Sequence, residues 1–161
     1  MPILVHLTAE ANVKKILRNG IKAIAYSAVE RKGVYCMPVL KDFYASHQWL
    51  RELKRGSGRE KSEVVAIDFR LPSSDIVLVG HYSQPHVETT IAEAAKVIMT
   101  AEDPMGYELF LPRSVHRDEI HKVRAVPQVI GWRYHPKAKG TKPCPCEYCS
   151  KGEYGASKLR K

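Results

Sequence analysis

The chain has 161 residues, of which 44% are hydrophobic and 27% charged, so it can bury the core of one globular domain. No run approaches the ~18 apolar residues of a membrane span, and the start lacks the features of a signal peptide. These absences exclude a membrane partner and lead us to expect a cytoplasmic protein. The net charge is +9, and eight Lys and Arg against two Glu lie between Arg133 and Lys161. This charge favours nucleic acid as a partner, with a tail that only aids solubility as the alternative.

The N-terminal part is expected to hold a strand and a helix. Residues 3–5 are aliphatic and β-branched and predict a first strand. Thr8 is a good N-cap for a helix over residues 9–19, and Gly20 suits the position after the last helical turn. Residues 21–32 show no clear period and are interpreted as partly loop.

Strands and helices continue to alternate after this segment. A short apolar run over residues 34–37 predicts a buried strand, and helical spacing after it predicts a helix over residues 41–55. The other expected elements are strands over residues 64–71, 75–79, 105–112 and 120–130 and a helix over residues 89–100. Strands mixed with two or three helices, without an internal repeat, indicate an α+β fold.

Two polar residues stand out in this pattern. Glu108 interrupts an apolar strand, so it either faces solvent by the alternation of the strand or is retained for its chemistry. His6 ends the first strand, where a structural or surface role is the simpler interpretation. Neither residue alone indicates a function.

Together with two further motifs, these residues form an ordered set. His6 is followed two residues later by Thr8, the strand Gly33-Val34-Tyr35 is followed by a helix that carries Tyr44, and Glu108 begins a late strand. In this order and strand context, the chain resembles the ADP-ribosyltransferases of the histidine–tyrosine–glutamate class, the group of the poly-ADP-ribose polymerases. The resemblance covers roughly residues 1–130.

The resemblance implies a split, strongly bent two-sheet core with flanking helices that binds NAD⁺ in its cleft. It assigns to Glu108 the stabilisation of an oxocarbenium-like transition state. His6 would hold the adenosine-side ribose and Thr8 the nicotinamide amide. Tyr35 and Tyr44 would stack on the two faces of the nicotinamide ring, each contributing ~1 kcal/mol. Catalysis would thus involve Glu108, His6 and Tyr35.

Departures from the family pattern bear on the acceptor. Leu7 replaces a glycine often found between the histidine and the threonine, and the resulting form is similar to the DNA-modifying DarT toxins. Gly106 stands where transferases that modify protein arginine carry a second glutamate. A nucleic-acid acceptor, RNA or single-stranded DNA, is therefore favoured, and the enzyme would be a toxin or phage-defence effector with a possible antitoxin partner.

A cysteine cluster near the C-terminus predicts a second site. Cys144, Cys146 and Cys149 have the spacing C-x-C-x₂-C, which lets three thiolates surround one zinc ion. His135 is the best local fourth ligand and Cys36 the alternative. The site would be structural zinc, with free thiols in a mobile tail as the competing interpretation.

Basic and aromatic residues near this cluster are candidate acceptor contacts. We expect a catalytic domain over residues 1–132 and a basic, cysteine-rich, zinc-knuckle-like extension over residues 133–161. Loop residues 81–88, which include His81, Tyr82, His86 and Glu88, are weaker candidates, and Trp132 is as well explained by core packing. The proposed acceptor-binding residues are Trp132, Arg133, Lys151, Lys158 and Arg160. The alternatives are a protein ADP-ribosyltransferase, an RNA 2′-phosphotransferase, and a non-catalytic zinc-containing nucleic-acid-binding module.

Overall fold

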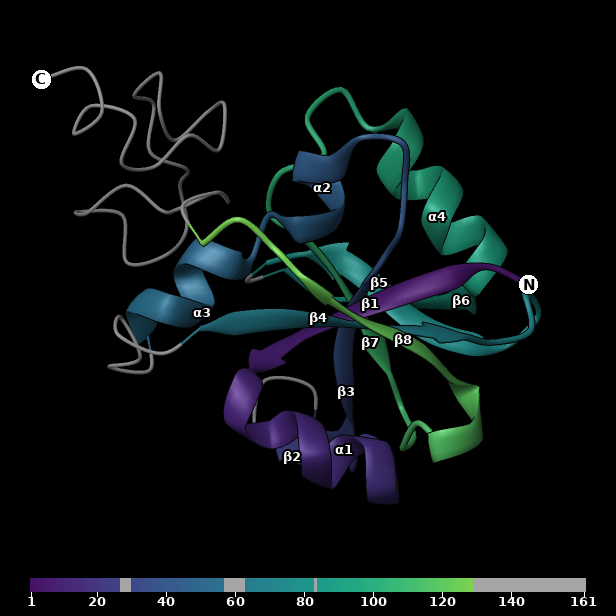
Figure 1. Cartoon of the computed structure of the whole chain (residues 1–161). Helices are drawn as coiled ribbons and strands as arrows, with labels where there is room; N and C mark the ends of the chain where they lie inside the picture. Colours follow the sequence, from purple (N-terminus) through teal and green to yellow (C-terminus); the bar gives the residue numbers. More distant parts are fainter. Residues whose placement is uncertain (27–29, 57–62, 83, 129–161) are drawn as a thin grey trace, which may run out of the picture.

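A computed structural model describes residues 1–26, 30–56, 63–82 and 84–128. This part of the chain is α+β, with eight antiparallel strands and a few helices (Figure 1). The strands are β1 (Ile3–Ala9), β2 (Ile24–Tyr26), β3 (Arg31–Pro38), β4 (Val64–Arg70), β5 (Ile76–His81), β6 (Val87–Thr90), β7 (Tyr107–Leu111) and β8 (Ile120–Ala125). The helices are α1 (Val13–Asn19), α2 (Phe43–His47), α3 (Leu50–Gly56) and α4 (Ile91–Thr100), with 3₁₀ turns η1 (Glu10–Asn12) and η2 (Arg117–Glu119).

The strands follow the order β6-β5-β7-β3-β1-β4-β8, and β2 pairs with β3 beside this path. β1 pairs with β4 along its whole length, from Ile3 to Ala9. Its pairing with β3 has only two residue pairs, Leu4 with Pro38 and Val5 with Met37. The two central strands therefore separate beyond Val5, and space opens between them.

The core lies against the central strands. β4 is buried at six of its seven positions, since elements cover both of its faces. α4 adds an amphipathic face that begins at the N-cap Thr90, whose hydroxyl accepts from the backbone N–H of Glu93. The largest fully buried hydrophobic side chains are Leu4, Leu50, Ile67, Phe69, Leu71, Ile91, Ile98, Leu109, Phe110 and Leu111.

Most of the expected elements are confirmed, and the others differ in their bounds or are divided. Thr8 is not a helix N-cap, because it continues β1 and pairs with Val65 before a 3₁₀ turn leads into α1. Gly20 ends α1 as expected, with a φ of 77° and its N–H bonded to the Ile16 carbonyl. The segment expected to be partly loop contains β2, and β6 takes up the start of the expected helix over residues 89–100.

The expected helix over residues 41–55 is two helices. α2 begins after Asp42, whose carboxylate accepts from the N–H groups of Tyr44 and Ala45, and it ends at His47. A turn at residues 48–49 separates it from α3. Phe43 and Tyr44 are exposed, and the buried face is formed by Ala45, Ser46, His47, Gln48 and Leu50.

No helix within the described ranges is long and apolar enough to cross a membrane. The cysteine-rich extension expected over residues 133–161 lies outside the described residues.

Candidate functional site

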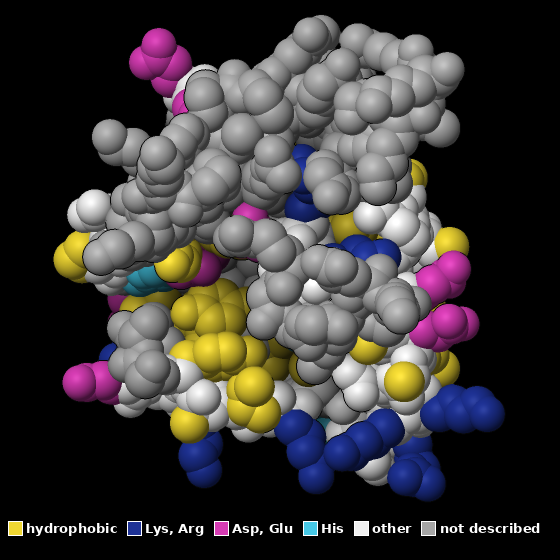
Figure 2. Space-filling view, turned by 90° about the vertical axis from the view of Figure 1, so that its left-hand side faces the viewer, with side chains coloured by type: hydrophobic (Ala, Val, Ile, Leu, Met, Phe, Trp, Pro, Cys, Tyr) yellow, Lys and Arg dark blue, Asp and Glu magenta, His cyan; other side chains and the backbone are white. Residues whose placement is uncertain are grey.

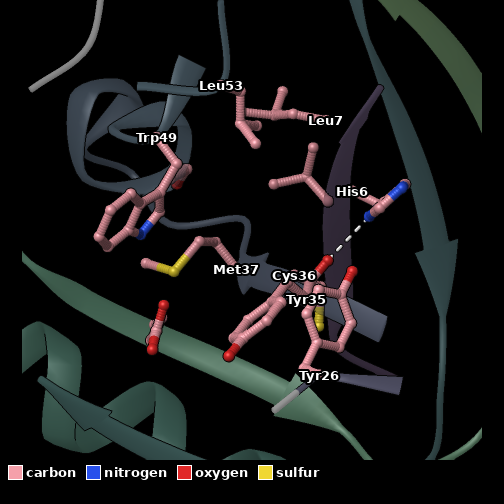
Figure 3. A pocket seen from close by; sticks show the side chains of 11 residues that line it. His6, Leu7, Tyr26, Tyr35, Cys36, Met37, Trp49 and Leu53 are labelled. Carbon is pink, nitrogen blue, oxygen red and sulfur yellow. Dashed lines mark hydrogen bonds between the residues drawn. The ribbon is translucent and has the colours of Figure 1, made fainter. Parts of the chain in front are cut away.

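A cavity of about 200 Å³ opens where β1 and β3 separate. On this face of the molecule, hydrophobic side chains gather in a hollow, with His and acidic side chains at its upper border and Lys and Arg below it (Figure 2). Side chains from β1, β2, β3 and the α2–α3 region surround the space (Figure 3). The lining residues are Val5, His6, Leu7, Tyr26, Tyr35, Cys36, Met37, Ser46, Trp49, Leu53 and Glu108.

Two tyrosine rings line one side of this cavity, and a third aromatic ring packs against both of them. Tyr35 contacts Tyr26 edge-to-face with ring centroids 4.5 Å apart, and both contact Phe110, at 5.1 and 5.7 Å. Burial, with the negative charge of Glu108 as a smaller cause, raises the pKa of Tyr35 to about 12. Its phenol therefore stays neutral at physiological pH and offers the cavity a flat ring with a hydroxyl group.

His6 bridges the gap between the separating strands. Its Nδ1 lies 2.8 Å from the backbone carbonyl oxygen of Tyr35 (Figure 3). Because a carbonyl only accepts, Nδ1 carries the hydrogen and Nε2 keeps a lone pair. Burial lowers the pKa of His6, against the effect of this hydrogen bond, so the ring stays neutral.

Glu108 faces the cavity from the neighbouring strand β7. Phe110 pairs with Tyr35 across the β3–β7 ladder, and Glu108 lies two residues before it on the same face. Its side chain is 17% exposed. Burial raises the pKa of this carboxyl, while His86 and His81 oppose the change. The site therefore places one partly buried carboxylate at the edge of an aromatic cavity.

His86 contacts Glu108 from the segment between β5 and β6. Its Nε2 lies 3.0 Å from Oε1 of Glu108, and its side chain is 7% exposed. The sequence indicated only that His86 belongs to a loop of possible acceptor contacts. Its pairing with a strand residue 22 positions later depends on tertiary structure.

The turn before β7 is held by the junction of α2 and α3. Gln48 is fully buried; its side-chain amide donates to the Pro104 carbonyl, and its Oε1 accepts from the Gly106 N–H. Trp49 donates from Nε1 to the Tyr107 carbonyl at 2.8 Å. These hydrogen bonds fix the position at which the chain enters the strand that carries Glu108.

The structure brings three of the expected site residues together: His6, Tyr35 and Glu108 line the same cavity. Thr8 and Tyr44 are not among its lining residues. The Thr8 hydroxyl accepts from the Asn12 amide, and Tyr44 is 40% exposed on α2. The expected residues that lie outside the described part of the chain are Trp132, Arg133, His135, Cys144, Cys146, Cys149, Lys151, Lys158 and Arg160.

Two lining aromatics were not expected from the sequence. Tyr26 lies in a three-residue strand within a segment that lacks periodicity, and only its pairing through β2 to β3 brings it to Tyr35. Trp49 lay within the expected helix, and the sequence did not predict the turn in which it lies.

The alternative metal ligand Cys36 is buried, and burial raises the pKa of its thiol. Among the described residues, no group of three or more His, Cys, Asp and Glu side chains is placed to hold a metal ion.

Comparison with protein-family models, with curated proteins and with solved structures found no match for this chain.

Proposed function

We propose that this protein is an NAD⁺-dependent ADP-ribosyltransferase that transfers ADP-ribose to nucleic acid, either RNA or single-stranded DNA. The observation that supports the proposal is the convergence of His6, Tyr35 and Glu108 on one cavity, from three strands that are far apart in the sequence. This ordered set is also the basis of the resemblance noted above. The role of a toxin or phage-defence effector belongs to the same proposal.

The cavity suits the nicotinamide end of NAD⁺. At about 200 Å³ it is below the ~300 Å³ at the lower end of ligand pockets, so it accommodates one ring system while the rest of a dinucleotide lies outside. Tyr35 offers a ring for stacking. Tyr26 and Trp49 would supply the second aromatic contact with nicotinamide, which the resemblance assigned to Tyr44.

Zinc binding by the cysteine cluster remains a separate proposal, and metal analysis of the purified full chain tests it.

Glu108 would act on the bond between the anomeric carbon and nicotinamide. As this bond breaks, its electron pair leaves with nicotinamide and positive charge develops on the ribose. A carboxylate at the cavity edge stabilises that charge, and its partly buried setting strengthens the interaction. A lone pair of the acceptor then forms the new bond to the anomeric carbon, and the acceptor's proton passes to Glu108 or to solvent.

The charge of the described residues supports a polyanionic acceptor. α1, the segment after it and β3 carry exposed Lys and Arg side chains. These are Lys14, Lys15, Arg18, Lys22 and Lys32. Phosphate groups gain from such a surface irrespective of base sequence.

The test is nicotinamide release and labelled ADP-ribose transfer with RNA, single-stranded DNA or protein as acceptor. We expect transfer to nucleic acid and a loss of about 100-fold or more in Glu108→Gln, with NAD⁺ binding largely retained. Glu93→Gln, which alters an exposed carboxylate on α4, is the matched control. Transfer to protein alone, 2′-phosphate removal from RNA, or nucleic-acid binding without nicotinamide release would each establish one of the alternatives instead.

A further inference from the structure

Within the described ranges, the ring of His86 contacts Glu108 through Nε2 and the Gln84 backbone through Nδ1. Nδ1 of His86 lies 2.9 Å from the Gln84 carbonyl oxygen, which only accepts, so Nδ1 carries a hydrogen. Nε2 is buried and has no well-aligned hydrogen-bond partner among the described residues, although it lies close to Glu108. The Nε2–Oε1 distance is 3.0 Å, although the two groups are not aligned as in a good hydrogen bond.

The position of a proton follows from this geometry. Without a hydrogen between them, the lone pair of Nε2 would face a lone pair of the Glu108 carboxylate at 3.0 Å, in a site with little water. Such a contact is repulsive, and neither group could recover its lost hydration. One proton on Nε2 replaces the repulsion by the attraction of an ion pair.

Gly80 makes room for this contact. It pairs with Glu108 across the β5–β7 ladder, and a Cβ on it would lie 3.1 Å from the Cα and the ring of His86. His86 therefore lies directly over β5, and a side chain at position 80 would require it to shift by a few tenths of an ångström. Close approach at this position places the imidazole against the carboxylate.

We infer that His86 and Glu108 share one proton, which resides on His86 in the working state, so that His86 is a positioning residue for the Glu108 carboxylate. His86 holds the carboxylate against the cavity edge and keeps it ionised. The consequence for transfer rests on the proposed function; the shared proton does not.

Other titratable groups near His86 and Glu108 also affect the ionisation of the Glu108 carboxyl. His81 on β5 favours the ionised form of Glu108, while Tyr35 on β3 bears no charge at neutral pH. Glu88, two residues after His86, forms an exposed ion pair with Arg31. Burial raises the pKa of Glu108 and His86 opposes this, so removal of His86 leaves the carboxyl protonated to higher pH.

The direct test is an NMR spectrum of the histidine ring nitrogens in the full chain at pH 7. We expect both ring nitrogens of His86 to carry hydrogen in the wild type and Nδ1 alone in Glu108→Gln, because the variant lacks the carboxylate that favours a proton on Nε2. Glu88→Gln should show the wild-type pattern, since Glu88 faces Arg31 and solvent. The same pattern in Glu108→Gln as in the wild type would overturn the inference.

A second measurement covers the case in which Glu108→Gln does not fold. In the wild-type chain at pH 7, the side-chain carboxyl carbon of Glu108 should have the chemical shift of a carboxylate, with hydrogen on both ring nitrogens of His86. A protonated Glu108 carboxyl, or a His86 ring without hydrogen on Nε2, would overturn the inference.

Transfer kinetics test the positioning role. His86→Gln should lower kcat about tenfold at pH 7 with KM for NAD⁺ unchanged, and the loss should shrink as pH rises and Glu108 ionises. A loss equal at all pH values would make His86 merely structural and overturn this role. If the wild-type chain shows no transfer, the proposed function fails while the NMR result still decides the shared proton.

Discussion

The indole Nε1 of Trp49 donates a 2.8 Å hydrogen bond to the carbonyl oxygen of Tyr107, the residue immediately before Glu108. Trp49 also lines the cavity, so one side chain both bounds the site and anchors the strand that carries its carboxylate. Gln48 supports the same turn through Pro104 and Gly106. The break between α2 and α3 thus has a structural purpose, because a continuous helix would direct these side chains elsewhere.

Trp49→Phe should separate anchoring from packing. The variant keeps an aromatic ring but leaves the Tyr107 carbonyl without its donor, which costs about 1 kcal/mol of unfolding free energy. We also expect reduced transfer, since Glu108 follows that carbonyl. Urea unfolding and transfer rates measure the two effects, with Tyr44→Phe on the exposed part of α2 as the control. Full activity in Trp49→Phe would show that the hydrogen bond does not position Glu108.

An ion pair with a buried carboxylate joins two neighbouring strands of the sheet, β4 and β8. Arg124 on β8 donates from Nε and Nη2 to the two carboxylate oxygens of Asp68, at 2.7 and 2.8 Å, and Asp68 is 2% exposed. We expect Asp68→Asn to lower the free energy of unfolding by about 3 kcal/mol, because Arg124 would lose its counter-charge. Urea unfolding measures it. Glu93→Gln in the exposed pair with Lys96 should cost less than about 1 kcal/mol, and equal costs would contradict this prediction.

His47 should make stability depend on pH. It is buried between two partners: Nδ1 donates to the Phe43 carbonyl, and Nε2 accepts from Arg124 at 3.1 Å. Burial, with Arg124 as a further cause, lowers its pKa below 6.5. As pH falls through 6.5, His47 takes up a proton in the unfolded chain but stays neutral in the folded chain, so the free energy of unfolding falls.

The slope from one such histidine is at most about 1.4 kcal/mol per pH unit. His6, whose pKa burial also lowers, adds to it, whereas Glu108, with a raised pKa, acts in the opposite direction. Urea unfolding of wild type and His47→Gln between pH 7.5 and 5 isolates the His47 contribution as the difference between the two curves. A difference that does not change with pH would show that His47 is not held neutral.

Tyr35 and Tyr44 should differ in NAD⁺ binding. Tyr35 lines the cavity and packs on Tyr26, whereas Tyr44 is 40% exposed and outside it. If the proposed function holds, Tyr35→Leu loses a stacking face worth ~1 kcal/mol, which weakens binding about fivefold. Tyr44→Leu should bind NAD⁺ as the wild type does. Calorimetric titration measures both, and the reverse result would return Tyr44 to the site.

Local patterns in the sequence determined most of the elements. Aliphatic runs and glycine or proline boundaries indicated the strands that hold His6, Tyr35 and Glu108. A buried strand needs apolar side chains at consecutive or alternate positions, and this pattern is visible in the sequence. The polar interruption at Glu108 also identified a residue that needs explanation. These features depend on contacts close in the chain, and a single sequence displays them.

Only the tertiary structure decided how the site is completed. The separation of β1 from β3 after two residue pairs opens the cavity, and no local pattern records where two strands stop pairing. β2 brings Tyr26 to Tyr35, and the turn between α2 and α3 brings Trp49 to the residue before Glu108. The lack of a side chain at Gly80 lets His86 approach Glu108. The exposure of Tyr44 also depends on tertiary structure. The hydrogen bonds of Gln48 and Trp49 to the turn before β7 orient α2, and in this orientation Tyr44 faces outward.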